Sequence, residues 1–238
     1  IKGEKAYEEL QRLCTANIKN EIGKCTYTHM LNEGAGIETD LTVVCIDNNH
    51  FRIISSAAVR THDKAHILKY LSPDVEFKDV TDDIICLGVF GPKSRDLLSK
   101  LTNEDLSNEN FKFGTSKIIK IGSVNVWTQR LSYVGELGYE LYIDQDKGKE
   151  IYDLIVNTGK DFKLSHCGSH AMDIMRMESG FLHWGHDISP EENQYQAGLN
   201  FAISFKKPFN FIGKEQLQKI KDQKLDRRFA MFVLKNSE

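Results

Sequence analysis

The sequence lacks the features that define several large classes of protein. It has five cysteines in 238 residues, an odd number without a CxxC pair, which argues against a disulfide scaffold and is typical of free thiols in a reducing compartment. No apolar run approaches the roughly 18 residues that a membrane-spanning helix needs. Neither sign of charge dominates, with 31 basic and 34 acidic residues. We therefore expect a globular protein with neither nucleic acid nor a membrane as its partner.

Dinucleotide and metal motifs are also missing. No glycine-rich loop of the kind that binds dinucleotides is present, so we expect no flavin domain in this chain. The pairs His166/His170 and His183/His186 have spacings found in metal sites, but no set of cysteines or carboxylates completes a tetrahedral site. We therefore expect no metal centre.

Helical and strand patterns alternate along the chain. Helices are predicted at 6–14, 63–71, 91–101, 149–157 and 169–178, and strands at 41–46, 51–54, 84–90, 116–121, 124–129, 139–143 and 229–234. The polar turn 47–50 and Gly122-Ser123 predict two hairpins. The apolar run 84–90 predicts a buried strand, and Ser169 is expected to cap its helix. Strand pairs between helices, without strict βαβ order, indicate an α+β fold with mostly antiparallel sheet.

The segment Arg176–Ile188 carries the densest mixture of functional side chains. It holds an arginine, acidic residues, two histidines and a tryptophan around two glycines. Such groups are costly to bury unless they are paired, which favours a ligand cavity over a structural corner. Arg176 offers a two-pronged donor for a carboxylate, and Trp184 offers a flat face for a ring.

Two glycine-bearing turns each present an acid. The segment Tyr27–Asp40 brings Asp40 to the start of the strand predicted at 41–46, and Tyr133–Glu140 places Glu136 between two glycines. Asp40 can equally be read as the end of a loop, and acids beside glycine are common in turns. Neither turn is sufficient evidence for a site by itself.

The order and spacing of several blocks resemble the tetrahydrofolate-binding aminomethyltransferase family, which includes the glycine cleavage T-protein. The blocks are Asn32–Val44, Tyr133–Glu140, Arg176–Ile188, Gly198–Ile203 and Phe211–Lys214, so the resemblance covers nearly the whole chain. Within the family, Tyr27–Asn32 and Gly180–Ile188 look most similar to the folate domains of sarcosine and dimethylglycine dehydrogenases.

This resemblance implies a cloverleaf of three subdomains around a folate channel. We expect residues 1–106 to form the first, 107–225 the second, and 226–238 the start of a third, C-terminal barrel that lies outside this chain. The expectation agrees with the chain's ends, since it begins at Ile1 without methionine and stops just after the predicted strand 229–234. The implied reaction transfers a methylene unit from an aminomethyl or iminium donor to tetrahydrofolate and gives 5,10-methylenetetrahydrofolate.

The resemblance also implies roles for single residues. Asp40 matches the acid beside the reacting folate nitrogens and is the expected catalytic residue. Glu136 matches an acid that accepts hydrogen bonds from the pterin ring, Tyr27 and Trp184 are candidates to pack on its flat rings, and Arg176 is a candidate to pair with an acid or with the folate carboxylates. The sequence departs from T-proteins at Thr39, where they carry a first aspartate before the matching one, and this points towards the dehydrogenase relatives.

Alternatives come from other functional classes. One is a folate-binding module without turnover, like the iron–sulfur assembly relatives of the same fold, which carry Lys-Gly-Cys-aromatic-x-Gly-Gln where this chain has the sequence of 180–186. The other is a folate-dependent demethylase of a methylated amine or sulfonium compound. The expected partners are an amine-derived donor with either a lipoyl carrier protein or a flavoprotein, in the cytoplasm or, in a eukaryote, the mitochondrial matrix.

Overall fold

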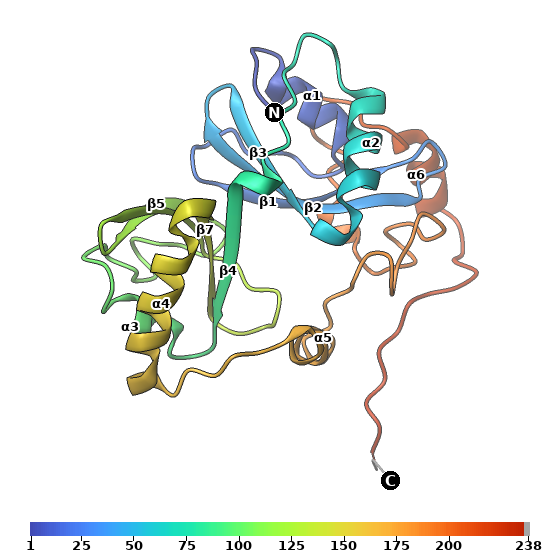
Figure 1. Ribbon diagram of the computed structural model, residues 1–238. Helices are drawn as coiled ribbons and strands as arrows, with labels where there is room; N and C mark the ends of the chain where they lie inside the picture. Colours follow the sequence, from blue (N-terminus) through green and yellow to red (C-terminus); the bar gives the residue numbers. More distant parts are fainter. Residues whose placement is uncertain (236–238) are drawn as a thin grey trace. The chain divides into compact units, whose positions relative to one another are not determined.

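The computed structural model describes residues 1–235, which form two compact units (Figure 1). Unit 1 combines residues 1–20 and 26–77 with the segment that begins at Leu182, and unit 2 combines residues 21–25 with 78–181. This division differs from the expected consecutive ranges 1–106, 107–225 and 226–238. The difference arises from long-range strand pairing and packing, which local sequence patterns do not reveal.

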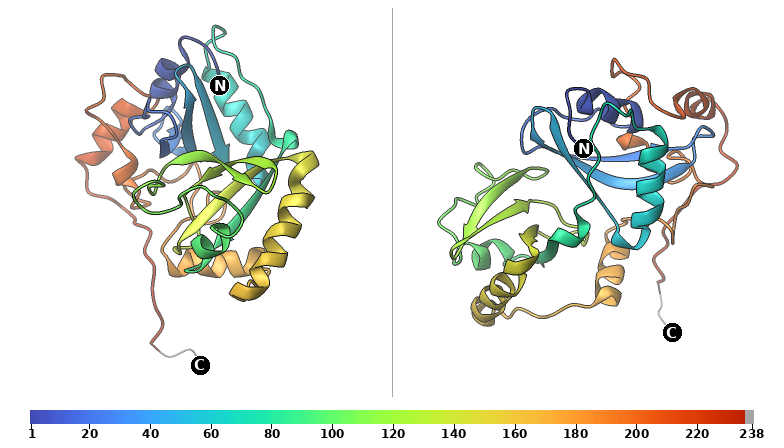
Figure 2. Two further views of the ribbon diagram at one scale, coloured as in Figure 1. Left: turned by 90° about the vertical axis from the view of Figure 1, so that its left-hand side faces the viewer. Right: turned by 45° about the horizontal axis from the view of Figure 1, so that its top comes forward.

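Unit 1 is built on a three-stranded sheet in the order β1-β2-β3. Its strands are β1 (Cys25–Leu31, whose first residue belongs to unit 2), β2 (Ile37–Asp47) and β3 (His50–Ser55), and its helices are α1 (Ala6–Leu13), α2 (Arg60–Tyr70) and α6 (Lys214–Lys221). Strands β2 and β3 form the expected hairpin. Helices α1 and α2 pack on the sheet (Figure 2), where Leu10 and Ile67 join Val43 and Phe51 in one apolar core.

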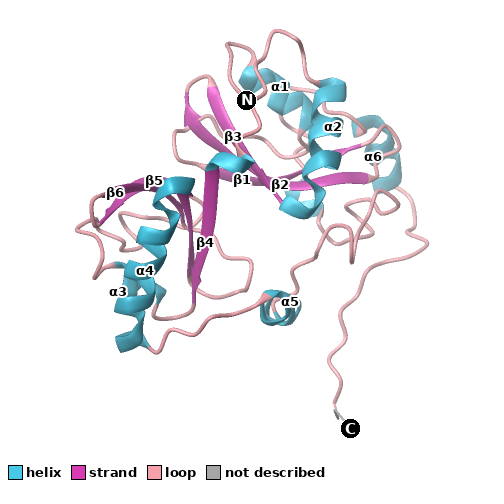
Figure 3. Ribbon diagram, viewed as in Figure 1, coloured by secondary structure: helices cyan, strands magenta, loops and turns pink. Residues whose placement is uncertain are grey.

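Unit 2 contains a four-stranded antiparallel sheet in the order β4-β7-β6-β5. Its strands are β4 (Ile84–Phe90), β5 (Ser116–Ile121), β6 (Val124–Gln129) and β7 (Gly138–Asp144), and its helices are α3 (Ser94–Leu98), α4 (Gly148–Gly159) and α5 (Ser169–Glu178). Helices α3 and α4 lie along one side of the sheet (Figure 3). Alternate strand residues such as Ile119 and Leu141 face Leu98 and Ile151 of these helices in a second core.

Short 3-10 helices complete the described chain. They cover Ala57–Val59, Thr81–Asp83, Gln145–Lys147, Lys160–Phe162 and Asn200–Ala202. Within residues 1–235, no helix is both long and apolar enough to cross a lipid bilayer.

Four local expectations were wrong. Strand β4 is an edge strand, and only Val89 of its seven residues is buried. The helix expected from residue 91 begins at Ser94, because Gly91 adopts a positive φ of 119°. The N-cap of α5 is Gly168, not Ser169. Residues 229–234 form no strand and are largely exposed.

Candidate active site

The predicted catalytic residue Asp40 lies inside β2, not at the end of a loop. Strand β2 begins at Ile37, four residues before the start that the sequence predicted at Leu41. Burial alternates along it, so that Thr39 and Leu41 face the core while Glu38 and Asp40 lie on the other side. A strand therefore fixes the carboxyl group of Asp40 more firmly than a loop would.

Tyr27 on the neighbouring strand β1 contacts Asp40. Burial raises the pKa of Asp40 from 3.8 to about 7, a hydrogen bond from Tyr27 opposes this shift, and the nearby carboxyl of Asp63 adds to it. The Tyr27 ring is 37% exposed and stacks on the ring of Phe201, with centroids 6.0 Å apart. The pair therefore offers an accessible aromatic surface beside a carboxyl group that changes its charge near neutral pH.

A second acidic cluster lies along β2 and α2. His62 Nε2 lies 3.2 Å from Glu38 Oε2, and His62 Nδ1 lies 3.3 Å from Asp63 Oδ1. The Trp184 ring lies 4.9 Å from the His62 ring, and its Nε1 donates to the carbonyl of Ile37 at 2.7 Å. The sequence predicted that Trp184 packs on a flat ring of the ligand. The structure places Trp184 in unit 1 with Tyr27 and Asp40, and its indole N–H donates to a backbone carbonyl and not to a ligand.

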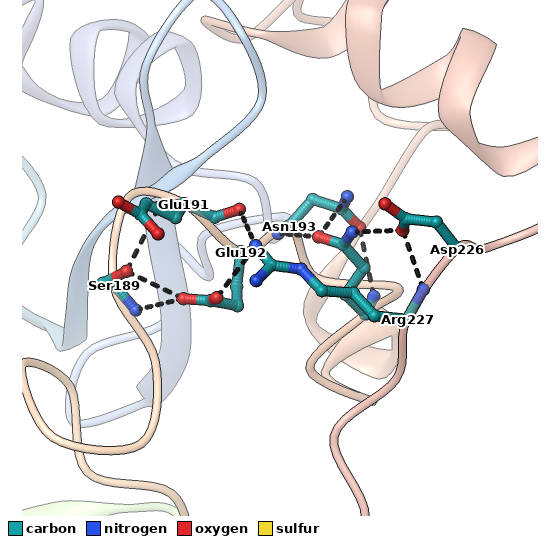
Figure 4. A network of polar contacts seen from close by, with 7 residues as sticks. Ser189, Glu191, Glu192, Asn193, Asp226 and Arg227 are labelled. Atoms are coloured by element: carbon teal, nitrogen blue, oxygen red, sulfur yellow. Dashed lines mark hydrogen bonds and ion pairs between the residues drawn. The ribbon is translucent and has the colours of Figure 1, made fainter.

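The loop after Trp184 is held by a polar network (Figure 4). The backbone N–H and hydroxyl of Ser189 donate to Glu192, whose carboxylate also pairs with Arg227 at 3.1 Å. Gln196 Nε2 donates to Asp226 at 3.0 Å, which connects the same loop to the C-terminal segment. The network therefore fixes the backbone on both sides of Gln194, a fully buried side chain in the middle of this loop.

Unit 2 contains the other two predicted site residues. Glu136 is exposed in the turn before β7, where Gly135 has a positive φ of 73°. Arg176 is only 2% exposed, and its guanidinium donates to Asp173 at 2.7 Å and to the carbonyl of Phe181 at 3.0 Å. These contacts hold the C-terminal end of α5 together, which gives Arg176 a structural role.

Sequence reasoning missed several polar residues close to these positions. Glu140 on β7 has a raised pKa because it is largely buried, and Tyr142 donates to it at 2.7 Å. In unit 1, sequence reasoning did not single out His29, Asp63 and Gln194. The two-residue spacing of Tyr27 and His29 on a strand was the one available signal, since it places both side chains on one face.

Comparisons with known proteins identify relatives along the whole chain. The family model described as "GCVT N-terminal domain" matches residues 1–207. The mitochondrial dimethylglycine dehydrogenase of Homo sapiens is 36% identical over 98% of this chain and 27% of its own length. An aminomethyltransferase of Caldanaerobacter subterraneus is 35% identical over 98% of this chain and 63% of its own length. The chain thus spans about a quarter of the first relative and under two thirds of the second.

One solved structure shares the fold. The glycine cleavage system aminomethyltransferase T from Bartonella henselae has a TM-score of 0.78 and is 22% identical, and the alignment covers 92% of this chain and 59% of that one. The similarity confirms the mixed fold with antiparallel sheets that the sequence predicted.

Proposed function

Because the chain belongs to the family of the GCVT N-terminal domain, we propose that it transfers a methylene unit from an aminomethyl or iminium donor to tetrahydrofolate. The product would be 5,10-methylenetetrahydrofolate. The proposal is supported by relatives named aminomethyltransferase and dimethylglycine dehydrogenase. Membership of the family confirms the resemblance drawn from the sequence, and the reaction itself is our inference.

The single observation that carries the proposal is the state of Asp40. Asp40 is held on β2 beside the Tyr27 hydroxyl, and burial raises the pKa of its carboxyl to about 7, so that it can take up and release a proton near neutral pH. A general base works best when its pKa lies near the working pH, because it is then both present as base and strong enough to take a proton. An aspartate at its ordinary value of 3.8 would be a much weaker base.

The residues of unit 1 suit the chemistry of closing a methylene bridge. Tetrahydrofolate supplies two nucleophilic nitrogens, N5 and N10, which together hold the carbon. Asp40 accepts the proton that N10 loses when its bond to the methylene carbon forms, and Tyr27 stabilises the carboxylate by donating to it. The exposed rings of Tyr27 and Phe201 provide flat surfaces for the folate rings. We retain Trp184, Glu136 and Arg176 as candidate folate contacts, each to be tested separately.

Two sources of the transferred carbon are compatible with this reaction. The human relative is named a dehydrogenase, so an iminium made by a flavoprotein is one source of the carbon. A lipoyl carrier protein bearing an aminomethyl group is the other. With an iminium donor, N5 adds to the carbon of the C=N bond and its proton passes to the amine nitrogen; the amine then leaves as N10 bonds to the same carbon and gives its proton to Asp40. With the aminomethylated lipoyl carrier, the bonds of the carbon to sulfur and to nitrogen both break as its bonds to N5 and N10 form. The lipoyl thiol and ammonia then leave with the two protons that N5 and N10 lose, and Asp40 relays the one from N10.

The test compares donors with the same chain and tetrahydrofolate. One reaction contains an aminomethylated lipoyl carrier, and the others contain sarcosine or dimethylglycine with an amine-oxidising flavoprotein. We expect methylenetetrahydrofolate to form faster with the chain than without it for one donor class. Equal rates with and without the chain for every donor would reject the transferase proposal, and measured binding of tetrahydrofolate would then support the non-catalytic alternative.

A further inference from the structure

A line of buried hydrogen bonds runs behind the Tyr27 hydroxyl. Tyr27 Oη lies 3.1 Å from His29 Nε2, and His29 Nδ1 lies 2.8 Å from Gln194 Nε2. Gln194 Nε2 also lies 3.1 Å from Thr15 Oγ1, and Thr15 donates to the carbonyl of Ala202 at 2.9 Å. His29, Gln194 and Thr15 are completely buried. Only the Tyr27 end of this line reaches the surface.

The carbonyl of Ala202 determines the direction of every bond in the line. A carbonyl oxygen can only accept, so the Thr15 hydroxyl must donate to it and must accept from the Gln194 amide. The group of Gln194 that faces Thr15 is therefore the NH₂, whose second hydrogen points at His29 Nδ1. His29 must then carry its proton on Nε2 and donate to Tyr27, which leaves the tyrosine hydroxyl hydrogen free for Asp40.

These hydrogen-bond directions require a neutral imidazole at His29, since a protonated ring would donate from both nitrogens. Burial lowers the pKa of His29 to about 3, and His29 is 0% exposed. The ring therefore has one donor and one acceptor at neutral pH, and Gln194 decides which nitrogen is which.

We propose that Gln194 and His29 are positioning residues that orient the Tyr27 hydroxyl, so that it donates to Asp40 and not to the imidazole. They act through Tyr27 and need not touch the reacting atoms. The inference extends the proposed function, because it assigns the control of the candidate base to a pair of buried residues far apart in sequence. Without the amide, His29 can take its other tautomer and accept from Tyr27, and the carboxylate of Asp40 then loses its hydrogen bond.

Other charged groups also act on Asp40 and must be considered in any pH experiment. From α2, Asp63 faces Asp40 and raises its pKa. Asp63 in turn contacts His62 and lies near His66, and Glu38 on β2 pairs with His62. None of these groups touches Gln194 in the described contacts, so a change at Gln194 leaves them in place.

The first test is independent of turnover. In the full chain labelled with ¹⁵N-histidine, the His29 signals are assigned by their loss in His29→Gln. We expect a neutral ring protonated on Nε2 throughout the range from about pH 5 to 9. A ring protonated on Nδ1 would overturn the proposed direction.

The second test uses Gln194→Met, which keeps the size of the side chain but removes the donor, with Gln218→Met on the exposed face of α6 as matched control. A hydrogen bond to a charged group shifts a pKa by on the order of one unit. We therefore expect the acidic limb of the kcat/KM profile to move up by about one pH unit in Gln194→Met, with little change in tetrahydrofolate Kd, and not to move in the control.

The outcomes separate this inference from the proposed function. If Gln194→Met lowers stability but leaves the acidic limb unchanged, the residue is structural and the inference fails. If the wild-type chain has no turnover with any donor, the proposed function fails, and the tautomer of His29 still decides whether Gln194 sets the direction of the line.

Discussion

Replacing Asp40 by asparagine should make the protein more stable and less active. The folded state raises the pKa of Asp40 from 3.8 to about 7, so folding favours the protonated acid. Above pH 7 the folded chain must carry a charge that burial disfavours, while the unfolded chain carries the same charge in water. Wild-type stability therefore falls as pH rises from 3.8 to 7 and then stays level with respect to this group. Asparagine keeps the shape of the side chain and lacks the charge.

The size of the effect follows from the shift. A difference of about three pKa units corresponds to about 4 kcal/mol, and partial solvent access reduces this towards about 2 kcal/mol. We expect Asp40→Asn to gain this much over wild type in urea unfolding at pH 8, and the gain to shrink as pH falls towards 4. Comparing the two chains at each pH cancels the titration of groups that they share.

The turnover of Asp40→Asn should fall, although its stability rises. Loss of a general base typically lowers turnover by about 10² to 10⁴-fold. Binding of tetrahydrofolate should change little, because the Tyr27 hydroxyl can still donate to the amide oxygen. A stability difference that is the same at pH 5 and pH 8 would refute the buried, pKa-shifted carboxyl. Full turnover by the variant would refute its role as base.

Three further predictions concern other parts of the chain. Lys207→Met should lower the urea unfolding free energy by about 2 to 4 kcal/mol, because the buried ammonium donates to three carbonyls around the end of α1; unfolding no easier than wild type would contradict this role. Glu136→Gln should weaken tetrahydrofolate binding by about 1.5 to 3 kcal/mol in a titration, and Glu140→Gln is measured for comparison. If Glu140→Gln weakens binding and Glu136→Gln does not, the contact with the pterin ring belongs to Glu140. Gly36→Ala should lower the melting temperature sharply, since its Cβ would lie 1.9 Å from the Pro190 carbonyl oxygen, whereas Gly34→Ala, which meets only the Asn32 side chain, should not.

Local patterns were sufficient for most elements of the fold. The turn at Gly122-Ser123 joins β5 and β6 as predicted, because a glycine with a φ of 57° suits a two-residue hairpin. The polar turn 47–50 joins β2 and β3 for similar reasons. Pairing between distant strands was not predictable in this way. Residues of β4 pair with residues of β7 that lie 48 to 60 positions later, which joins residues 78–106 to unit 2.

The same limit applies to the candidate site. Asp40 and Tyr27 were found because they belong to one continuous block of the family pattern. Gln194 contacts His29 across 165 positions of sequence, and an isolated glutamine in a loop carries no signal of its own. The sequence therefore suggested the acid as a candidate, but the residues that affect its pKa and its hydrogen bonding became visible only in the fold.

The position of Thr39 answers the main chemical objection raised by the sequence. The resemblance to T-proteins implies an aspartate where this chain has Thr39, and this raises the question of whether the site lacks a second acid. Thr39 is completely buried, and its hydroxyl accepts from the backbone N–H of Met30 at 3.3 Å. Neighbouring residues on a strand point to opposite faces, so a side chain at position 39 points away from the Asp40 side of the sheet. An acid there would not join Asp40 and Tyr27 unless β2 shifted its register. The threonine therefore fits the core at position 39, and Glu38, Asp40 and Asp63 are the acids grouped at the candidate site.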